Sequence, residues 1–253
     1  MSIAFRKILV CLIAVIAFSA IASASASAFN LEWEVCEKGT GTGTKFSEHK
    51  CNTHLGGTEE WEFKKLVGTQ KVTSKGGAFT LEVTGKKIKC TSVTDKGTIT
   101  GGKPGTDLAE EIVFTGCTTS QAGCKVRSTP PPIVAFGTIV VTNIKTKLEE
   151  VAGKLVDKFE QKEVENAKKE KVKEFVTLEF EAEAGKSCSE FPTTKVKGDV
   201  AAECKNLANG NVELVFPKPA IAQTPKLEAF GLAATLTGTV EEELENKWAF
   251  RCT

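Results

Sequence analysis

The chain has 253 residues, with 33 lysine and arginine residues, 32 aspartate and glutamate residues and a net charge of +1. This balance excludes a general attraction to nucleic acid or to an anionic membrane, and the length fits one large β domain or two smaller domains. Aspartate occurs only at Asp95, Asp107, Asp157 and Asp199, which excludes the common Asp-rich calcium loop.

Residues 1–28 have the pattern of a secretory signal peptide. Arg6 and Lys7 precede an uncharged apolar run over 8–21, and an Ala-Ser repeat over 22–28 supplies a small-residue cleavage site. Cleavage after Ala28 would leave 225 residues with a net charge near −1 and no second apolar stretch of the roughly 20 residues that a membrane span needs. We therefore expect a secreted, extracellular protein with no transmembrane span once the signal is removed.

Eight cysteines follow the signal, and an even number of cysteines in a secreted chain predicts disulfides. They are Cys36, Cys51, Cys90, Cys117, Cys124, Cys188, Cys204 and Cys252. Proximity favours Cys36–Cys51, which would close a polar loop in the N-terminal segment 29–75, and Cys117–Cys124, which would close a short turn. A Cys188–Cys204 pair would leave Cys90 with Cys252, and the connectivity beyond the first two bonds stays open.

One group of residues in this loop resembles a metal site. His49, Cys51 and His54 lie within six residues, but a structural zinc site usually takes four ligands from two spaced pairs. A disulfide is the better explanation for Cys51. We therefore predict no metal and no cofactor.

Residues 76–146 form the first predicted β unit. Phe79, Leu81 and Val83 alternate with polar residues and so share one face of a strand. Strand-like runs recur about every 10 residues with glycine or proline between them. This pattern predicts a mainly β, antiparallel, sandwich-like fold.

A charged connector over 147–175 leads to the second predicted β unit, 176–253. Leu148, Val151, Leu155 and Phe159 fall at helical spacing, yet alternation also fits, so an extended hairpin is expected with at most a short helix. Short motifs recur in the same order in both units: residues 79–83 resemble 176–180, 111–114 resemble 213–216, and 135–137 resemble 229–231. These matches predict an internal duplication.

Catalytic motifs are missing from the sequence. A nucleophile–histidine pair would have to use one of two histidines in a loop. A glycosidase needs two carboxylates about 5–9 Å apart, and Glu179 with Glu181 on one strand face is such a pair, although a solvated strand face is the commoner explanation. Trp33, Trp61 and Trp248 could stack on a sugar, but buried core aromatics are commoner. No catalytic residue is assigned.

The order of several motifs resembles a known group of proteins. These motifs are Trp33-x-x-Cys36, the Gly-Thr-rich run at 41–44, Cys51, Glu60-Trp61, the Gly-Ala-Phe-Thr-Leu run at 77–81, Cys90, and Phe-Thr-Gly-Cys at 114–117 followed by Gly123-Cys124. They are similar to uncharacterised secreted cysteine-containing β proteins that occur as many paralogues in soil actinobacteria. The resemblance implies secretion and β structure, and because that group has no assigned activity it implies no functional residue.

These observations together predict a secreted binding or surface-interaction module for an extracellular ligand, either a glycan or a protein. We expect a binding module because the sequence has strong signals for a disulfide-bonded β scaffold and no catalytic motif. Two alternatives remain: a carboxylate-dependent hydrolase acting on a polysaccharide, and a structural component of the cell envelope.

Overall fold

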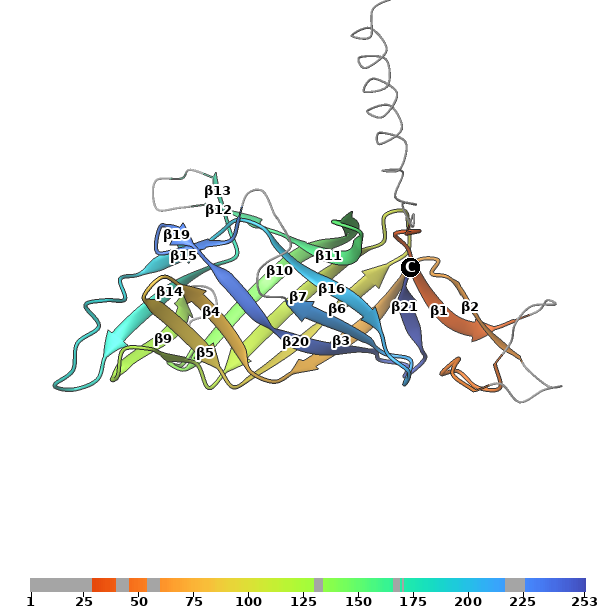
Figure 1. Cartoon of the computed structure of the whole chain (residues 1–253), viewed down its shortest axis with the longest axis horizontal. Helices are drawn as coiled ribbons and strands as arrows, with labels where there is room; N and C mark the ends of the chain where they lie inside the picture. The colour runs from red at the N-terminus through yellow and green to blue at the C-terminus, as the bar shows by residue number, and fades with distance from the viewer. Residues whose placement is uncertain are drawn as a thin grey trace, which may run out of the picture.

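The computed structural model describes residues 29–39, 46–53, 60–129, 134–165, 169, 171–216 and 226–253. Within these ranges every regular element is a strand and none is a helix (Figure 1). The mainly β expectation is therefore confirmed. The expected signal peptide, 1–28, lies outside the described residues.

Eight antiparallel strands follow one another in chain order around a closed barrel, and the last pairs with the first. They are β3 (Thr69–Gly76), β6 (Ser92–Thr100), β7 (Thr106–Thr115), β10 (Thr138–Val151), β11 (Lys154–Glu160), β16 (Val200–Asn206), β17 (Val212–Phe216) and β20 (Thr235–Leu244). The core is therefore a barrel and not the sandwich that the alternation favoured. The reason is that β20 pairs with β17 along 238–242 and with β3 along 240–244, so this part of the sheet has no open edge.

Strands inserted between the barrel strands build an extension of the sheet, on the left in Figure 1. These are β4 (Phe79–Val83), β5 (Lys86–Cys90), β8 (Thr118–Thr119), β9 (Cys124–Thr129), β14 (Val176–Ala182) and β15 (Thr194–Val196). They pair in that order and join the barrel where residues 235–237 of β20 pair with β4. Two short hairpins complete this description: β12 (Lys162–Glu165) with β13 (Lys171–Glu174), and β18 (Glu228–Ala229) with β19 (Leu232–Ala233).

A three-stranded sheet, which we call the lid, lies on the right in Figure 1 and consists of β1 (Trp33–Lys38), β2 (Trp61–Lys65) and β21 (Phe250–Cys252). It contacts two turns of the barrel, because the Gly105 N–H donates to Leu31 O at 2.7 Å and the Phe250 N–H donates to Gly210 O at 3.0 Å. The rings of Trp33 and Phe250 lie 5.9 Å apart and are almost completely buried. A Cβ at Gly105 would lie 2.6 Å from Trp33 Cδ1, so this turn needs glycine to let the indole approach.

Two buried apolar clusters fill the interior. The first joins the lid to the barrel and the second joins the barrel to the extension. Five partly buried side chains pack against both clusters: Ile112, Phe114, Phe159, Val200 and Leu236. The interior is therefore continuous from the lid to the extension.

Four disulfides join the eight predicted cysteines as Cys36–Cys51, Cys90–Cys117, Cys124–Cys188 and Cys204–Cys252. The predicted Cys36–Cys51 bond is confirmed. The predicted pairs Cys117–Cys124, Cys188–Cys204 and Cys90–Cys252 are wrong.

The pairing of strands explains why proximity along the chain predicted the wrong disulfides. In the β5–β8 ladder, Lys89 is opposite Thr118, so the next position of this antiparallel pair brings Cys90 beside Cys117. Cross-strand neighbours in such a ladder lie only about 4.5–5.5 Å apart. Cys124 begins β9 and lies opposite Ala182 at the end of β14, and its disulfide partner Cys188 follows β14 in sequence.

In the described residues of the charged connector, 147–175, the chain forms strand hairpins, as alternation allowed, and no helix. β10 and β11 pair from Lys145 opposite Glu160 to Val151 opposite Lys154. The two turn residues have positive φ, which is the requirement of a tight two-residue hairpin turn. The helical spacing arose by chance across that turn, because Leu148 and Leu155 are buried on the two strands whereas Val151, beside the turn, is only partly buried.

The strand order has a repeated form. β3 to β10 and β11 to β20 each supply four barrel strands, and in both sets two strands are inserted after the third barrel strand. After the first barrel strand, the first set inserts two strands (β4 and β5) and the second set inserts four (β12 to β15). The matched motifs at 79–83 and 176–180 lie in β4 and β14, and those at 111–114 and 213–216 lie in β7 and β17. Duplication, with its unit boundaries, stays a prediction, and both predicted units contribute strands to the same barrel.

Candidate functional site

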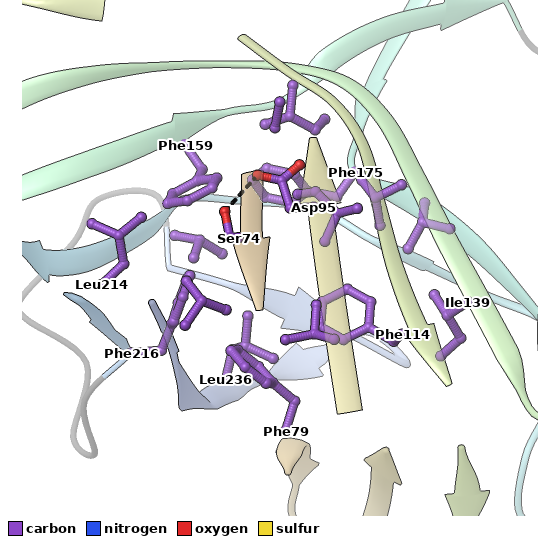
Figure 2. A pocket seen from close by; sticks show the side chains of 18 of the residues that line it. Ser74, Phe79, Asp95, Phe114, Ile139, Phe159, Phe175, Leu214, Phe216 and Leu236 are labelled. Atoms are coloured by element: carbon purple, nitrogen blue, oxygen red, sulfur yellow. Dashed lines mark hydrogen bonds between the residues drawn. The ribbon is translucent and has the colours of Figure 1, made fainter. Parts of the chain in front are cut away.

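A cavity of about 140 Å³ lies inside the molecule where the two apolar clusters meet (Figure 2). Barrel strands contribute one part of its lining and the extension contributes another, for example Ile88 of β5 and Leu178 of β14. Most of the lining is apolar. Residues from both predicted β units are therefore needed to build it.

One wall of the cavity is aromatic. Phe79 packs against Phe114 and Phe216 with ring centroids 5.4 and 5.3 Å apart, and Phe159 lies 5.5 Å from Phe216. We call these four rings the aromatic wall, and Figure 2 shows them around one space. Gly238 of β20 makes this packing possible, because a Cβ there would lie 2.6 Å from the Phe79 ring.

Four carboxyl groups point into the same interior, and we call them the acid cluster. They are Asp95 of β6, Asp107 of β7, Asp157 of β11 and Glu242 of β20. Each occupies the inward phase of its strand, where successive inward side chains are two residues apart. Three of them, Asp95, Asp107 and Glu242, line the cavity.

Hydrogen bonding satisfies the acid cluster only in part. Ser74 Oγ lies 3.1 Å from Asp95 Oδ2 and 3.4 Å from Glu242 Oε1, so its single hydroxyl proton serves one of the two carboxyls at a time (Figure 2 shows the Asp95 bond). Asp95 Oδ1, Asp107 Oδ1 and Glu242 Oε2 are buried without a hydrogen-bond partner, and Asp157 lies close enough to Thr146 and Asp107 for both side chains to influence its acidity. Buried polar groups usually have one.

Burial changes the acidity of all four groups. It raises the pKa of Asp95 to about 6 and the pKa of Asp157 to about 7. Burial, followed by repulsion from the Asp157 carboxyl, raises the pKa values of Asp107 and Glu242 well above their ordinary range. The physical cause is that a low-dielectric interior disfavours the charged carboxylate.

No positive charge compensates this cluster among the described residues: the ion pairs there involve other carboxyls, such as Asp199 with Lys158 at 3.4 Å. The same part of the chain contains no group of three or more His, Cys, Asp or Glu side chains arranged to hold a metal ion. The cavity can therefore bind apolar surface along its wall and accept hydrogen bonds or positive charge at the acid cluster.

The residues that the sequence singled out lie elsewhere. Glu179, on the outer part of the extension, forms an ion pair with Arg127 at 2.8 Å, and Glu181 lies opposite Lys125 in the β9–β14 ladder. These two carboxyls belong to a charged strand face and not to the cavity. His54 lies outside the described residues.

The three tryptophans do not form one surface. Trp33, the first residue of β1 in the lid, is fully buried. Trp61 and Trp248 are half-buried and meet edge to face with centroids 5.6 Å apart, while His49 lies against Trp61 at 6.0 Å. The core interpretation holds for Trp33, and the other two pack on each other at the outer side of the lid.

Sequence reasoning missed the acid cluster, although a signal was present. Leu155, Asp157 and Phe159 alternate along β11, so Asp157 stands in an apolar phase. Val240, Glu242 and Leu244 do the same along β20. An acidic residue in the inward phase of an otherwise apolar strand face marks such a site.

Within the described ranges there is no helix that is long and apolar enough to cross a bilayer. Comparisons with models of protein families, with curated proteins and with solved structures found no match to this chain.

Proposed function

We propose that this protein is a secreted binding protein that holds one small, mainly apolar molecule inside its barrel. The observation that carries the proposal is the cavity of about 140 Å³ with its aromatic wall. An apolar protein cavity of about this size is large enough to admit a benzene-sized molecule. The proposal narrows the expected ligand from a glycan or protein to a small molecule.

The energetics support a functional role for the cavity. Protein interiors are normally packed as closely as organic crystals. At about 24 cal/mol per Å³, an empty space of about 140 Å³ costs the fold about 3 kcal/mol. That is a large fraction of a typical net stability of about 5–15 kcal/mol, and a bound apolar molecule would offset it.

Secretion forms part of the proposal and has two supports. Four disulfides are typical of extracellular proteins, and residues 1–28 have the composition of a signal peptide. The polysaccharide hydrolase has weaker support, because a cavity of this volume has no room for a polymer and Glu179 is engaged with Arg127.

The test uses disulfide-intact protein and a series of neutral ligands, namely benzene, toluene and naphthalene. We expect toluene to raise the melting temperature and to give a saturable heat in titration calorimetry. Val93→Phe, on the inward face of β6 and lining the cavity, should abolish the effect by filling the space. Thr94→Phe, on the exposed face one residue later, is the matched control and should bind as the wild type does.

Failure of all three ligands to bind the wild-type protein would overturn the proposal without reference to any variant. Equal binding by the wild type, Val93→Phe and Thr94→Phe would also overturn it, because the ligand would then occupy another place.

A further inference from the structure

The cavity presents more hydrogen-bond acceptors than an apolar ligand needs. Asp95, Asp107 and Glu242 all line it, and each has one buried carboxyl oxygen without a partner. The Glu242 residue is only 3% exposed, so water outside the molecule does not satisfy its free oxygen. A buried acceptor left unpaired costs about 1–3 kcal/mol, and three of them at one place indicate that a donor belongs there.

The donor should carry positive charge. The groups that face one another across the interior are the four carboxyls of β6, β7, β11 and β20 with the hydroxyls of Ser74 on β3 and Thr146 on β10. The inward residues of β16 and β17, Ala202 and Leu214, are apolar. Every ionised member of this set repels the others, and a buried charge is stable only when it is paired.

We propose that the bound molecule is a small primary amine with an apolar body, whose ammonium group lies against Asp95, Asp107 and Glu242 while its body packs on the aromatic wall. This inference rests on the proposed function, since it names the ligand class of the same cavity. An ammonium group has three N–H donors and no acceptor, which matches three free carboxyl oxygens. Rings of the aromatic wall add attraction for a nearby cation.

An organic cation fits better than a metal ion. Metal ions need several ligands at fixed short distances, and the described side chains include no such arrangement. The apolar lining would also leave a bare metal ion without its remaining ligands or water. An amine with an apolar body would contact both the acid cluster and the aromatic wall.

Binding of the amine is linked to protons. The raised pKa values, about 6 for Asp95 and about 7 for Asp157, mean that these carboxyls are partly protonated near neutral pH in the empty protein. An ammonium ion stabilises the carboxylate form, so binding releases protons to solvent. Affinity for the amine therefore increases as pH rises from about 5.5 to 7.5, while affinity for a neutral ligand does not.

The experiment compares toluene, benzylamine and benzoate, which share one ring and differ in charge. In calorimetry at pH 7.5 we expect benzylamine to bind at least about tenfold more tightly than toluene, as a charged hydrogen bond predicts, and benzoate to bind least. Repeating the titration in buffers of different protonation enthalpy should show proton release with benzylamine only.

Variants place the effect on the acid cluster. Glu242→Gln and Asp107→Asn each keep the shape of the side chain and remove its charge, and each should weaken benzylamine binding about tenfold while leaving toluene binding unchanged. Glu241→Gln is the matched control, because Glu241 is the exposed neighbour of Glu242 on β20. It should not change either affinity.

The possible failures are distinguishable. Equal affinity for toluene and benzylamine would overturn the amine inference and leave the proposed function standing. Failure of every ligand to bind would overturn both. Micromolar binding of calcium that is lost in Glu242→Gln and Asp107→Asn would overturn the amine inference in favour of a metal ion.

Discussion

The inward faces of the same strands carry two different kinds of residue. On β20, Leu244 is fully buried and apolar, whereas Glu242, two residues earlier, is 3% exposed and acidic. On β6, Ile99 is fully buried, whereas Asp95 lines the cavity. Leu244 and Ile99 belong to the same cluster as Trp33 and the lid. Strand alternation fixes which residues face inwards, but it leaves open whether they stabilise the barrel or serve a ligand.

The two regions should therefore respond to mutation in opposite ways. At the lid, each buried apolar group removed from water stabilises the fold. In the acid cluster, buried carboxyls without a cation reduce stability. If both regions were simply parts of the core, substitutions in either region would destabilise the protein.

The largest effect is expected at the lid. Trp33→Ala should lower the free energy of unfolding by about 3–5 kcal/mol, because it leaves a cavity between the lid and the barrel. Urea unfolding followed by circular dichroism measures this. Val67→Ala is the control, since Val67 is 90% exposed and its loss should have little effect. Similar values for the two variants would show that the lid is not part of the cooperative fold.

A second effect at the lid concerns the bond that ties it to the barrel. Cys204 lies on β16 and Cys252 on β21, and they are 48 residues apart in sequence. Replacing both with serine should cost about 2–4 kcal/mol, mainly by freeing the unfolded chain. Unfolding of the double variant in urea gives the value. The cavity ligand should still bind this variant below its melting temperature, because the acid cluster and the aromatic wall are untouched.

Much of the fold was readable from the sequence, but closure of the barrel was not. Alternation and glycine spacing identify strands because a strand's side-chain period is local. Closure requires Val240 of β20 to lie opposite Gly76 of β3, and the sequence around neither residue predicts that pairing. The same holds for the Cys90–Cys117 bond, which depends on β5 meeting β8, whereas the confirmed Cys36–Cys51 bond closes a short loop.

The candidate site was readable in part. The scarcity of aspartate argues against calcium loops but does not by itself predict a site inside the barrel. Strand alternation adds a signal for a buried acid, because Asp157 lies between Leu155 and Phe159 on the apolar face of β11. What no single strand reveals is convergence, since the four carboxyls come from four strands and meet only when the barrel closes.

The acid cluster should make the protein less stable as pH rises. Asp157 has a pKa of about 7 in the folded protein and about 4 when unfolded. Between these values the folded state binds more protons, so this group's contribution falls with rising pH, by at most about 1.4 kcal/mol per pH unit. The Asp107→Asn/Asp157→Asn variant should lack this dependence and gain about 2 kcal/mol on the wild type between pH 5 and pH 8.

Urea unfolding of both proteins at pH 5, 6, 7 and 8 checks this prediction. The difference between them matters more than either curve, because groups outside the acid cluster titrate equally in both. A constant difference across that range would show that Asp107 and Asp157 do not titrate there, and the opposition between lid and cluster would lose its electrostatic basis.

The smallest expected effect concerns two adjacent residues of β20, the exposed Glu241 and the buried Glu242. Hydrogen bonds from Asn211 and then Asn209 lower the pKa of Glu241, whereas burial raises that of Glu242. Because the folded pKa of Glu241 is lowered, its contribution to stability is present above pH about 4.5 and is lost as pH falls. Solvent screening keeps it below about 1 kcal/mol.

Glu241→Gln should therefore lose a fraction of 1 kcal/mol at pH 7 and less at pH 3, relative to the wild type. Glu242→Gln should instead gain stability on the wild type as pH rises, since its neutral amide never has to be ionised in the interior. Unfolding curves at both pH values give the two signs. The same sign for both substitutions would mean that Glu242 is solvated like its neighbour, in which case the inward face of β20 carries no buried charge for a ligand to meet.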